Sequence, residues 1–307
     1  MTANVVVAGD ANLDLILRGD TVPRFGQAEQ LLSSADLVLG SSAGIVAAGL
    51  ARLGVSTSLA ARVGDDVFGA RTVELLRSAG VDVSRVRAVD EPTGLSVILS
   101  TPGDRAILTL TGALATLTGA DVLTAASEAD HVHVASFFLL PALAEELPAV
   151  LSELRARGVT TSFDTNWDPA ERWEGVAECL PHVDVLLPNA AEARALARAI
   201  GESPADTEDA ARLLARRGPL VVVKDGARGG FATSGDAIVR APGLTVDVVD
   251  TTGAGDSFDA GFLAAWLRRM PLAEAVRWGA VAGSLSTRAA GGTGGQATAE
   301  QVEQAAR

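Results

Sequence analysis

Short apolar runs alternate with amphipathic stretches along most of the chain. The runs that predict strands cover residues 4–10, 57–64, 130–136, 159–164, 183–189, 220–226 and 229–235. The stretches with helical periodicity cover residues 42–54, 67–80, 143–158, 174–180, 190–200, 207–218 and 256–270. Strands that alternate with helices in this way imply right-handed crossovers between parallel neighbours. The pattern therefore predicts an α/β fold in which helices cover both faces of a mainly parallel sheet.

Two stretches interrupt this rhythm, because residues 12–40 and 93–113 show period-two alternation and turn signals without helix. The second contains a hairpin, with strands at 96–100 and 105–111 around a turn at 101–104. Together they predict a small antiparallel β lid over the carboxyl ends of the parallel strands, where open α/β sheets bind ligands. The remaining segments, 1–11, 41–92 and 114–307, then form the α/β domain.

The predicted lid carries apolar residues that look exposed, and such an edge often pairs with a second copy of the chain. These residues are Leu15, Ile16, Leu17, Ile98 and Leu99. We therefore expect a homodimer that forms through the lids.

Charge and composition narrow the choice of partners. The 307 residues carry a formal net charge of −13, which argues against nucleic acids and anionic membranes. The chain has no apolar run long enough to cross a bilayer, its first residues lack the basic region of a signal peptide, and Cys179 is its single cysteine. These features predict a soluble cytoplasmic protein that holds any anionic substrate with a local device.

Residues 250–262, DTTGAGDSFDAGF, contain such a device. Gly253, Ala254 and Gly255 precede a helix, and the free N–H groups and positive dipole of a helix start suit a phosphate. Asp256 could then accept a proton from a substrate hydroxyl beside the anion, while Asp250 is a candidate ligand for a cation below the loop. The alternative is an ordinary glycine turn with Asp256 as helix cap.

The same thirteen residues closely resemble the D-T-x-G-A-G-D signature of the ribokinase-like (PfkB) carbohydrate kinases. The resemblance extends over nearly the whole chain. It implies a ribokinase-like three-layer α/β/α sandwich with a small antiparallel β lid. It also implies ATP-dependent phosphorylation of a hydroxyl group, with Asp256 as general base and Gly253–Asp256 as anion hole. Small-molecule sugar, ATP, Mg²⁺ and a monovalent cation such as K⁺ are the implied ligands.

Other positions match the family pattern. The implied substrate-binding residues are Asn12, Asp14, Gly40 and Ser41, to which Arg105 on the second lid hairpin is added. The implied ATP-binding residues are Asn189, Lys224, Gly226, Gly229 and Gly279. Glu192, in PNAAE, is implied to orient Mg²⁺ through water. The implied ligands of the monovalent cation are Asp250, Thr252, Ser286, Ala289 and Gly291.

Two departures bear on the substrate. Ile45 stands where the family usually has an asparagine that contacts the sugar, and Asp168 stands where many members have arginine. A carboxylate at 168 disfavours acidic or phosphorylated sugars, which favours a small neutral sugar. A nucleoside kinase and a non-catalytic sugar-binding relative remain as alternatives.

Other chemistries find less support in the chain. A dinucleotide-binding glycine motif is missing after the first strand, and Lys224 is followed by Asp225, which excludes a Walker motif. His131 and His133 lie two apart on a predicted strand without acidic or cysteine neighbours, so we expect a structural pair. Cys179 is expected to be a small buried hydrophobe.

Overall fold

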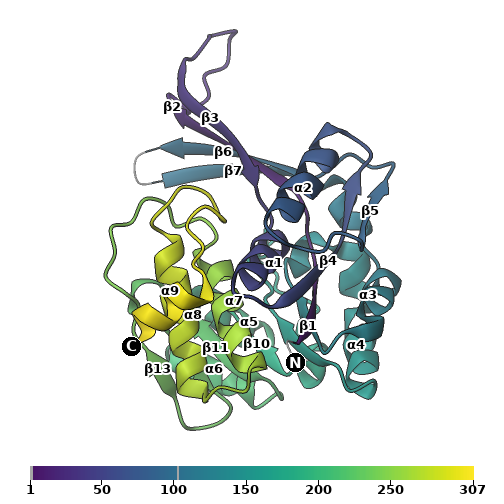
Figure 1. The fold of residues 1–307 in the computed structure, drawn as a ribbon, viewed down its shortest axis with the longest axis vertical. Helices are drawn as coiled ribbons and strands as arrows, with labels where there is room; N and C mark the ends of the chain where they lie inside the picture. Colours follow the sequence, from purple (N-terminus) through teal and green to yellow (C-terminus); the bar gives the residue numbers. More distant parts are fainter. Residues whose placement is uncertain (1–2, 102–103) are drawn as a thin grey trace.

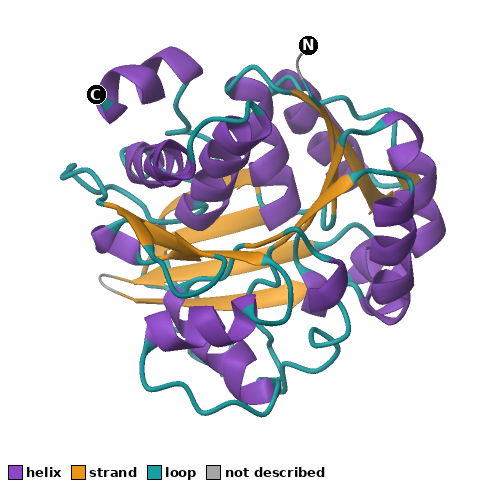
Figure 2. Cartoon of the chain, turned by 90° about the horizontal axis from the view of Figure 1, so that it is seen from below, coloured by secondary structure: helices purple, strands orange, loops and turns teal. Residues whose placement is uncertain are grey.

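The computed structural model describes residues 3–101 and 104–307 and contains a nine-stranded sheet with helices on both faces (Figures 1 and 2). The strand order is β13-β12-β11-β10-β9-β8-β1-β4-β5. The strands are β1 (Asn4–Ala8), β4 (Ser56–Gly64), β5 (Val86–Val89), β8 (His131–Val134), β9 (Thr160–Phe163), β10 (Val185–Leu186), β11 (Leu220–Lys224), β12 (Gly230–Thr233) and β13 (Val239–Ala241). Only the β11–β12 and β12–β13 pairs are antiparallel. The predicted mainly parallel sheet is thus confirmed.

Alternating side chains of β1 pack in two separate hydrophobic cores. Val5 and Val7 pack in the core shared by α1 (Ser42–Arg52), α2 (Val67–Ser78), α7 (Ala254–Leu267), α8 (Leu272–Ser286) and α9 (Ala299–Ala306). Val6 and Ala8 pack in the opposite core with α3 (Gly119–Ala125), α4 (Pro141–Ala156), α5 (Ala190–Ala199) and α6 (Thr207–Ala215). Both faces of the sheet are therefore covered, as a continuous apolar strand requires.

A second, four-stranded sheet projects from the first and is visible at the top of Figure 1. Its order is β3 (Leu32–Leu39), β2 (Leu13–Gly19), β6 (Leu95–Thr101) and β7 (Asp104–Leu110). The two outer pairs are antiparallel, as predicted, and they meet through a parallel pair between β2 and β6. Two residues of the predicted turn, 102 and 103, and the first two residues of the chain lie outside the described residues.

The two faces of the small sheet differ in chemistry. Asp14 pairs with Val38 and Ser96, so these side chains share one face. The residues one position away along the strands point to the opposite face. There they form an apolar row of Leu15, Leu37, Val97 and Leu108. Two residues expected to be exposed, Ile16 and Ile98, are 4% and 5% exposed and lie on the Asp14 face. The prediction was wrong for these two because their sheet parity turns them toward the protein.

The helix predicted for residues 174–180 is also absent. This segment forms turns that end in a short 3₁₀ helix, Leu180–His182. Gly175 and Trp173 have φ angles of 83° and 59°, which interrupt a right-handed helix at its start. Val176, Cys179 and Leu180 are nevertheless buried. The apolar pattern therefore predicted the burial of these side chains correctly, but not the backbone conformation.

Several short or uniformly apolar elements have no counterpart among the predicted ones. The largest is α8, whose buried Ala, Gly and Val residues pack against α7, α9, β12 and β13. A helix that is apolar all round shows little periodicity. No helix among the described residues has the length and apolar character that crossing a membrane requires.

Candidate active site

The glycine loop before α7 has the geometry of an anion site. Gly253 is the N-cap residue, with φ 70°, and no side chain caps the helix. A Cβ atom on Gly253 would lie 2.7 Å from Cα of Gly292 and 3.1 Å from Cγ2 of Ile45, so the loop tolerates only glycine there. Ala254 N donates to Thr251 O at 3.2 Å, whereas the N–H groups of Gly255 and Asp256 have no acceptor among the described residues and remain available for an anionic ligand.

A cavity of about 450 Å³ opens beside this loop. Its lining includes Lys224 at the end of β11, Gly226 and Gly229 after this strand, and Ala254 and Gly255 at the start of α7. Val246, Val248, Phe258, Ala280 and Gly283 add an apolar wall. Three of the predicted ATP-binding residues are thus brought to one cavity.

Gly279 takes a different place. A Cβ atom at Gly279 would lie 3.0 Å from Cε1 of Phe258, within the contact between α7 and α8. The cavity wall on α8 is formed instead by Ala280 and Gly283. Gly279 thus lies in the helix contact behind the cavity, and its role in ATP binding stays a prediction.

Asp256 lies in the first turn of α7 and is half-buried. Its Oδ1 accepts a hydrogen bond from Oγ of Ser42, at the start of α1. Desolvation by the surrounding protein raises the pKa of Asp256 to about 7, although the Ser42 hydrogen bond opposes the change. Because its carboxylate bonds to another helix rather than to its own N–H groups, Asp256 is not a helix cap. A carboxyl with a pKa near neutrality is suited to proton transfer.

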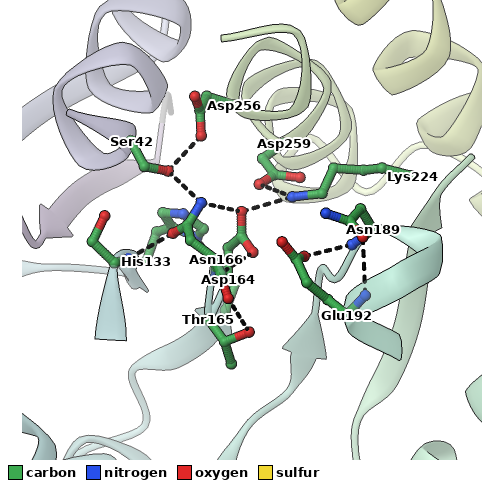
Figure 3. A network of polar contacts seen from close by, with 12 residues as sticks. Ser42, His133, Asp164, Thr165, Asn166, Asn189, Glu192, Lys224, Asp256 and Asp259 are labelled. Carbon is green, nitrogen blue, oxygen red and sulfur yellow. Dashed lines mark hydrogen bonds and ion pairs between the residues drawn. The ribbon is translucent and has the colours of Figure 1, made fainter. Parts of the chain in front are cut away.

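A chain of polar contacts starts at Asp256 and returns to the same helix (Figure 3). Asn166 Nδ2 donates to Ser42 Oγ at 3.0 Å and to Asp164 Oδ2 at 3.2 Å. Lys224 Nζ continues the chain, lying 2.6 Å from Asp164 Oδ2 and 3.0 Å from Asp259 Oδ2. The contacts therefore connect α1, β11, α7 and the segment after β9 through one network of buried and half-buried side chains.

The small sheet brings a second group of side chains to this end of the molecule. Asn12 and Asp14 are 4% and 8% exposed, and Asn12 Nδ2 donates to Asp14 Oδ1 at 3.3 Å. A Cβ atom on Gly40 would lie 2.2 Å from Asp14 Oδ1, so this carboxylate rests directly on the Gly40 backbone. Burial and the nearby charge of Asp10 raise the pKa of Asp14 to about 6.

The N-terminus of α1 is held by two side chains. Ser41 adopts φ 69° and accepts a hydrogen bond from Gly44 N. Asp10, directly after β1, accepts hydrogen bonds from the N–H groups of Ser42 and Ala43 at 3.1 and 2.9 Å. This contact fixes Ser42 beside Asp256.

Arg105 connects the small sheet to the glycine loop. Its Nη1 donates to Thr252 Oγ1 at 3.0 Å. Asp250 accepts hydrogen bonds from Thr252 N, Thr252 Oγ1 and Gly291 N at 2.8–3.0 Å. Partial burial works against ionisation, but these donors and Arg105 lower the pKa of Asp250. Three of the predicted monovalent-cation ligands, Asp250, Thr252 and Gly291, therefore lie together.

Ser286 is less suited to such a site. Its hydroxyl donates to Gly283 O, and its carbonyl oxygen lies 2.2 Å from the position that a Cβ atom of Gly295 would occupy. No hydrogen bond among the described residues links Ala289 to Asp250. The parts played by Ser286 and Ala289 in a cation site therefore stay predictions.

Asn189 and Glu192 form a capping box at the start of α5. Asn189 Oδ1 accepts from Ala191 N and Glu192 N, and Glu192 Oε2 accepts from Asn189 N at 2.8 Å. Burial and the charge of Asp164 raise the pKa of Glu192 to about 7. Glu192 is thus held at the edge of the network that Figure 3 shows.

Asp168 is bonded to its own loop. Its carboxylate accepts hydrogen bonds from the N–H groups of Ala170, Arg172 and Trp173 at 2.7–2.8 Å. The carboxylate therefore closes the loop after β9, and the repulsion of acidic sugars from this residue stays a prediction.

Ile45, at the family's asparagine position, also has a packing role. It is 3% exposed, and its Cδ1 lies 2.3 Å from where a Cβ atom of Gly292 would be. Ile45 thus supports the loops beside Gly253 from behind.

The two strand histidines are fully buried. His131 bonds Thr160 and Ser162, and His133 bonds Ser162, at 2.7–2.9 Å. Burial lowers the pKa of His131 to about 3 and that of His133 to about 4, so both rings are neutral. Cys179 is buried as expected, and burial raises its pKa to about 12.

Sequence reasoning missed Asp10 and Asp259. Asp10 follows the first strand, the usual place for a polar group at the ligand end of an α/β sheet. Asp259 interrupts the apolar residues of a helix and follows Asp256 by three positions, which places both on one face. The position of each aspartate relative to the strand or helix could therefore have identified it as a candidate site residue.

Comparisons with known proteins agree with this geometry. Residues 2–299 match the model of the pfkB family of carbohydrate kinases. The chain is 33% identical to an ATP-dependent ribose-1-phosphate kinase from Halopiger xanaduensis, over 92% of this chain and 91% of the relative. It is 34% identical to a 2-dehydro-3-deoxygluconokinase from Bacillus subtilis, over 84% and 83%. The solved Arabidopsis thaliana ribokinase complexed with ribose and ATP superposes with a TM-score of 0.87 at 26% identity, covering 100% and 99%.

Proposed function

The chain belongs to the pfkB family of carbohydrate kinases, and from this premise we propose that it transfers the γ-phosphoryl group of ATP to a hydroxyl of a small neutral sugar. Asp256 is the general base, and the N–H groups of residues 253–256 form the anion hole. One observation carries the proposal: the half-buried Asp256 carboxyl adjoins an uncapped helix start that lines a cavity.

The reaction follows from these positions. The sugar hydroxyl gives its proton to Asp256 while its oxygen forms a bond to the γ-phosphorus, and the bond from that phosphorus to the bridging oxygen of ADP breaks. The N–H groups at the start of α7 and the ammonium of Lys224 offset the charge on the phosphoryl oxygens. Ser42 and Asn166 hold the base in place through the contacts described above.

Magnesium would arrive with ATP, and the acidic residues near Lys224 fit it. Glu192 is buried at 4% exposure, and the charge of Asp164 adds to its raised pKa, so a hard cation nearby would relieve this repulsion. Glu192 would hold the ion through water, and the ion would neutralise phosphate charge. No step of the proposed transfer needs a monovalent cation, so we assign none to K⁺.

The sugar is proposed to lie between the small sheet and the start of α1. Residues 12–40 and 93–113 form the lid of this site. Asn12 and Asp14 bind sugar hydroxyls, with Gly40 and Ser41 below them. Asp10, Asp14 and Asp256 make this region acidic, which favours a neutral sugar over an anionic one.

A sugar that carries an anionic group is the second candidate. Arg105 reaches the glycine loop from the small sheet, and an arginine can bind a carboxylate or phosphate with two hydrogen bonds. The two relatives that are about one third identical are named for ribose 1-phosphate and 2-dehydro-3-deoxygluconate.

ADP production over a panel of acceptors tests these alternatives. The panel holds ribose, fructose, ribose 1-phosphate, 2-dehydro-3-deoxygluconate and adenosine. We expect turnover of a neutral sugar, and we expect Asp256→Asn to lower kcat by about 10³-fold, because general bases typically contribute 10²–10⁴-fold.

Preference for an anionic sugar that is lost in Arg105→Gln would favour the second candidate. Preference for adenosine would favour a nucleoside kinase. Undiminished activity of Asp256→Asn would remove the proposed base, and no turnover of any acceptor would favour a binding protein.

A further inference from the structure

Lys224 is the only lysine in the chain, and it is held from two sides. Its Nζ lies 2.6 Å from Asp164 Oδ2 and 3.0 Å from Asp259 Oδ2, and the three side chains are 10%, 1% and 0% exposed. An ammonium group has three N–H donors. Two of them are used by these carboxylates, so one donor remains.

The remaining donor adjoins the anion loop. Lys224 lines the same cavity as Ala254 and Gly255. Its Cδ, Nζ and Cε lie 3.5, 3.7 and 3.8 Å from the position that a Cβ atom of Gly255 would occupy. A phosphoryl group bound by the N–H groups of this loop would therefore lie within reach of the ammonium.

Asp259 has no evident value for the stability of the fold. It lies on α7 among Phe258, Ala260, Gly261 and Phe262, all of which are buried. Its Oδ1 has no hydrogen-bond partner among the described residues. Burial raises the pKa of Asp259 well above its usual value, so its ionised form is costly here, and an apolar residue of similar volume would avoid this cost while Asp164 still pairs with Lys224. The contact with Lys224 is the feature that such a residue could not supply.

We propose that Asp259 is a positioning residue which, together with Asp164, directs the third N–H of Lys224 at the phosphoryl group in the anion loop. Asp164 alone leaves the ammonium free to rotate about one contact. The second carboxylate, on the helix that carries the loop itself, fixes the ammonium relative to Gly255 and Asp256. This inference rests on the proposed function, because it assigns a task to Lys224 in the same transfer step.

The single lysine permits a direct spectroscopic test. Labelling lysine with ¹⁵N at Nζ gives one ammonium signal in the whole protein. We expect a sharp, slowly exchanging signal that shifts when Mg²⁺ and a non-hydrolysable ATP analogue are added. Asp259→Leu should broaden the free signal and reduce the shift, whereas Asp259→Asn, which keeps an oxygen acceptor, should retain most of both. An unchanged signal and shift in Asp259→Leu would overturn the inference.

Kinetics give the second readout. Asp259→Leu should lower kcat roughly 10–100-fold with an unchanged KM for the sugar, the loss typical of a misdirected electrostatic contact. Asp259→Asn should fall between Asp259→Leu and the parent. Thermal unfolding should show no loss of stability in Asp259→Leu. If kcat instead follows the unfolding temperature across both variants, Asp259 is structural and the inference fails. Glu153→Gln, which removes an exposed ion pair with Arg157 on α4, is the control for charge alone.

Calorimetry with the same ATP analogue separates this inference from the proposed function. Nucleotide binding without any change in the lysine signal of the parent protein overturns the role of Lys224 and Asp259 only. Absence of nucleotide binding overturns the proposed function and this inference with it. Binding with the expected signal change supports the inference even before the sugar is known.

Discussion

The Asp256 network and the small sheet meet at the same end of the molecule, but they are built in opposite ways. In the network, buried and half-buried polar groups from four segments are bonded to one another, from Ser42 to Asp259. In the small sheet, the outer face is apolar and open, and Leu37 and Leu108 are 40% and 62% exposed. The network is nearly satisfied within one chain, whereas the sheet presents apolar surface that the described residues leave open.

The difference indicates which parts of the site are rigid. Buried polar networks that are nearly satisfied specify one arrangement, because each unpaired group would cost free energy. The small sheet makes fewer such contacts with the body, and Arg105 to Thr252 is one of them. We therefore expect changes in the network to alter the chemical step and changes in the sheet to alter sugar binding and association.

The largest effect that separates the two regions is expected at Gly40, where the small sheet meets the body. In Gly40→Ala the new Cβ would lie 2.2 Å from Asp14 Oδ1 and 2.9 Å from Asn12 Nδ2, so Asp14 must move. We expect the KM for the sugar to rise about 10–100-fold, which corresponds to roughly 1.4–2.7 kcal/mol of binding free energy. The KM for ATP should stay unchanged.

Gly235→Ala is the matched control, because nothing lies within 4 Å of its Cβ position. Steady-state kinetics with each substrate varied in turn measure both constants. An equal rise in the two KM values would show that Gly40 supports the whole site rather than the sugar side.

A smaller effect is expected on association through the outer face of the small sheet. Leu108 belongs to the apolar row with Leu15, Leu37 and Val97. If two copies pair there about a twofold axis, each substitution appears twice in the interface. Leu108→Glu should then weaken dimerisation at least about tenfold, because buried carboxylates of like charge are costly.

Sedimentation at micromolar concentration measures the weakening of the dimer. Val67→Glu is the control, because Val67 is 77% exposed and lies on α2. A parent protein that sediments as a monomer would contradict the dimer. The structure already changes the expected interface: an open face, rather than a row that includes Ile16 and Ile98, is available to a second copy.

The body of the fold was predictable because its strands are short apolar runs and its helices have clear periods. The hydrophobic pattern did not predict α8, because a helix that is apolar all round has little periodicity. It also predicted a helix where single residues such as Gly175 impose a different backbone conformation. Asp256 was identifiable because it belongs to a contiguous motif. Asp164, Lys224 and Asp259 are far apart in sequence, so their shared contact depends on strand order that one sequence does not specify.

Asp168 shows the limit of matching single positions. Its residue type suggested electrostatic selection of the substrate, but its carboxylate is used by three backbone N–H groups of its own loop. A local hydrogen-bonding role of an aspartate is common in turns and cannot be separated from a ligand-binding role by residue type alone.

The smallest effect is expected in the pH dependence of the chemical step. Asp256 must be ionised to accept a proton, and its pKa is raised to about 7. In the parent, kcat/KM should therefore fall tenfold per pH unit below about 7 and level off above it. The hydrogen bond from Ser42 lowers the pKa of Asp256 against the effect of desolvation, so Ser42→Ala should move this limb to higher pH, by about 0.5–1 unit. Ser257→Ala is the control, because this buried serine contacts Gln296 rather than Asp256. A limb that moves to lower pH would mean that Ser42 does not stabilise the ionised carboxylate, and the base would then depend on Lys224 and the anion loop alone.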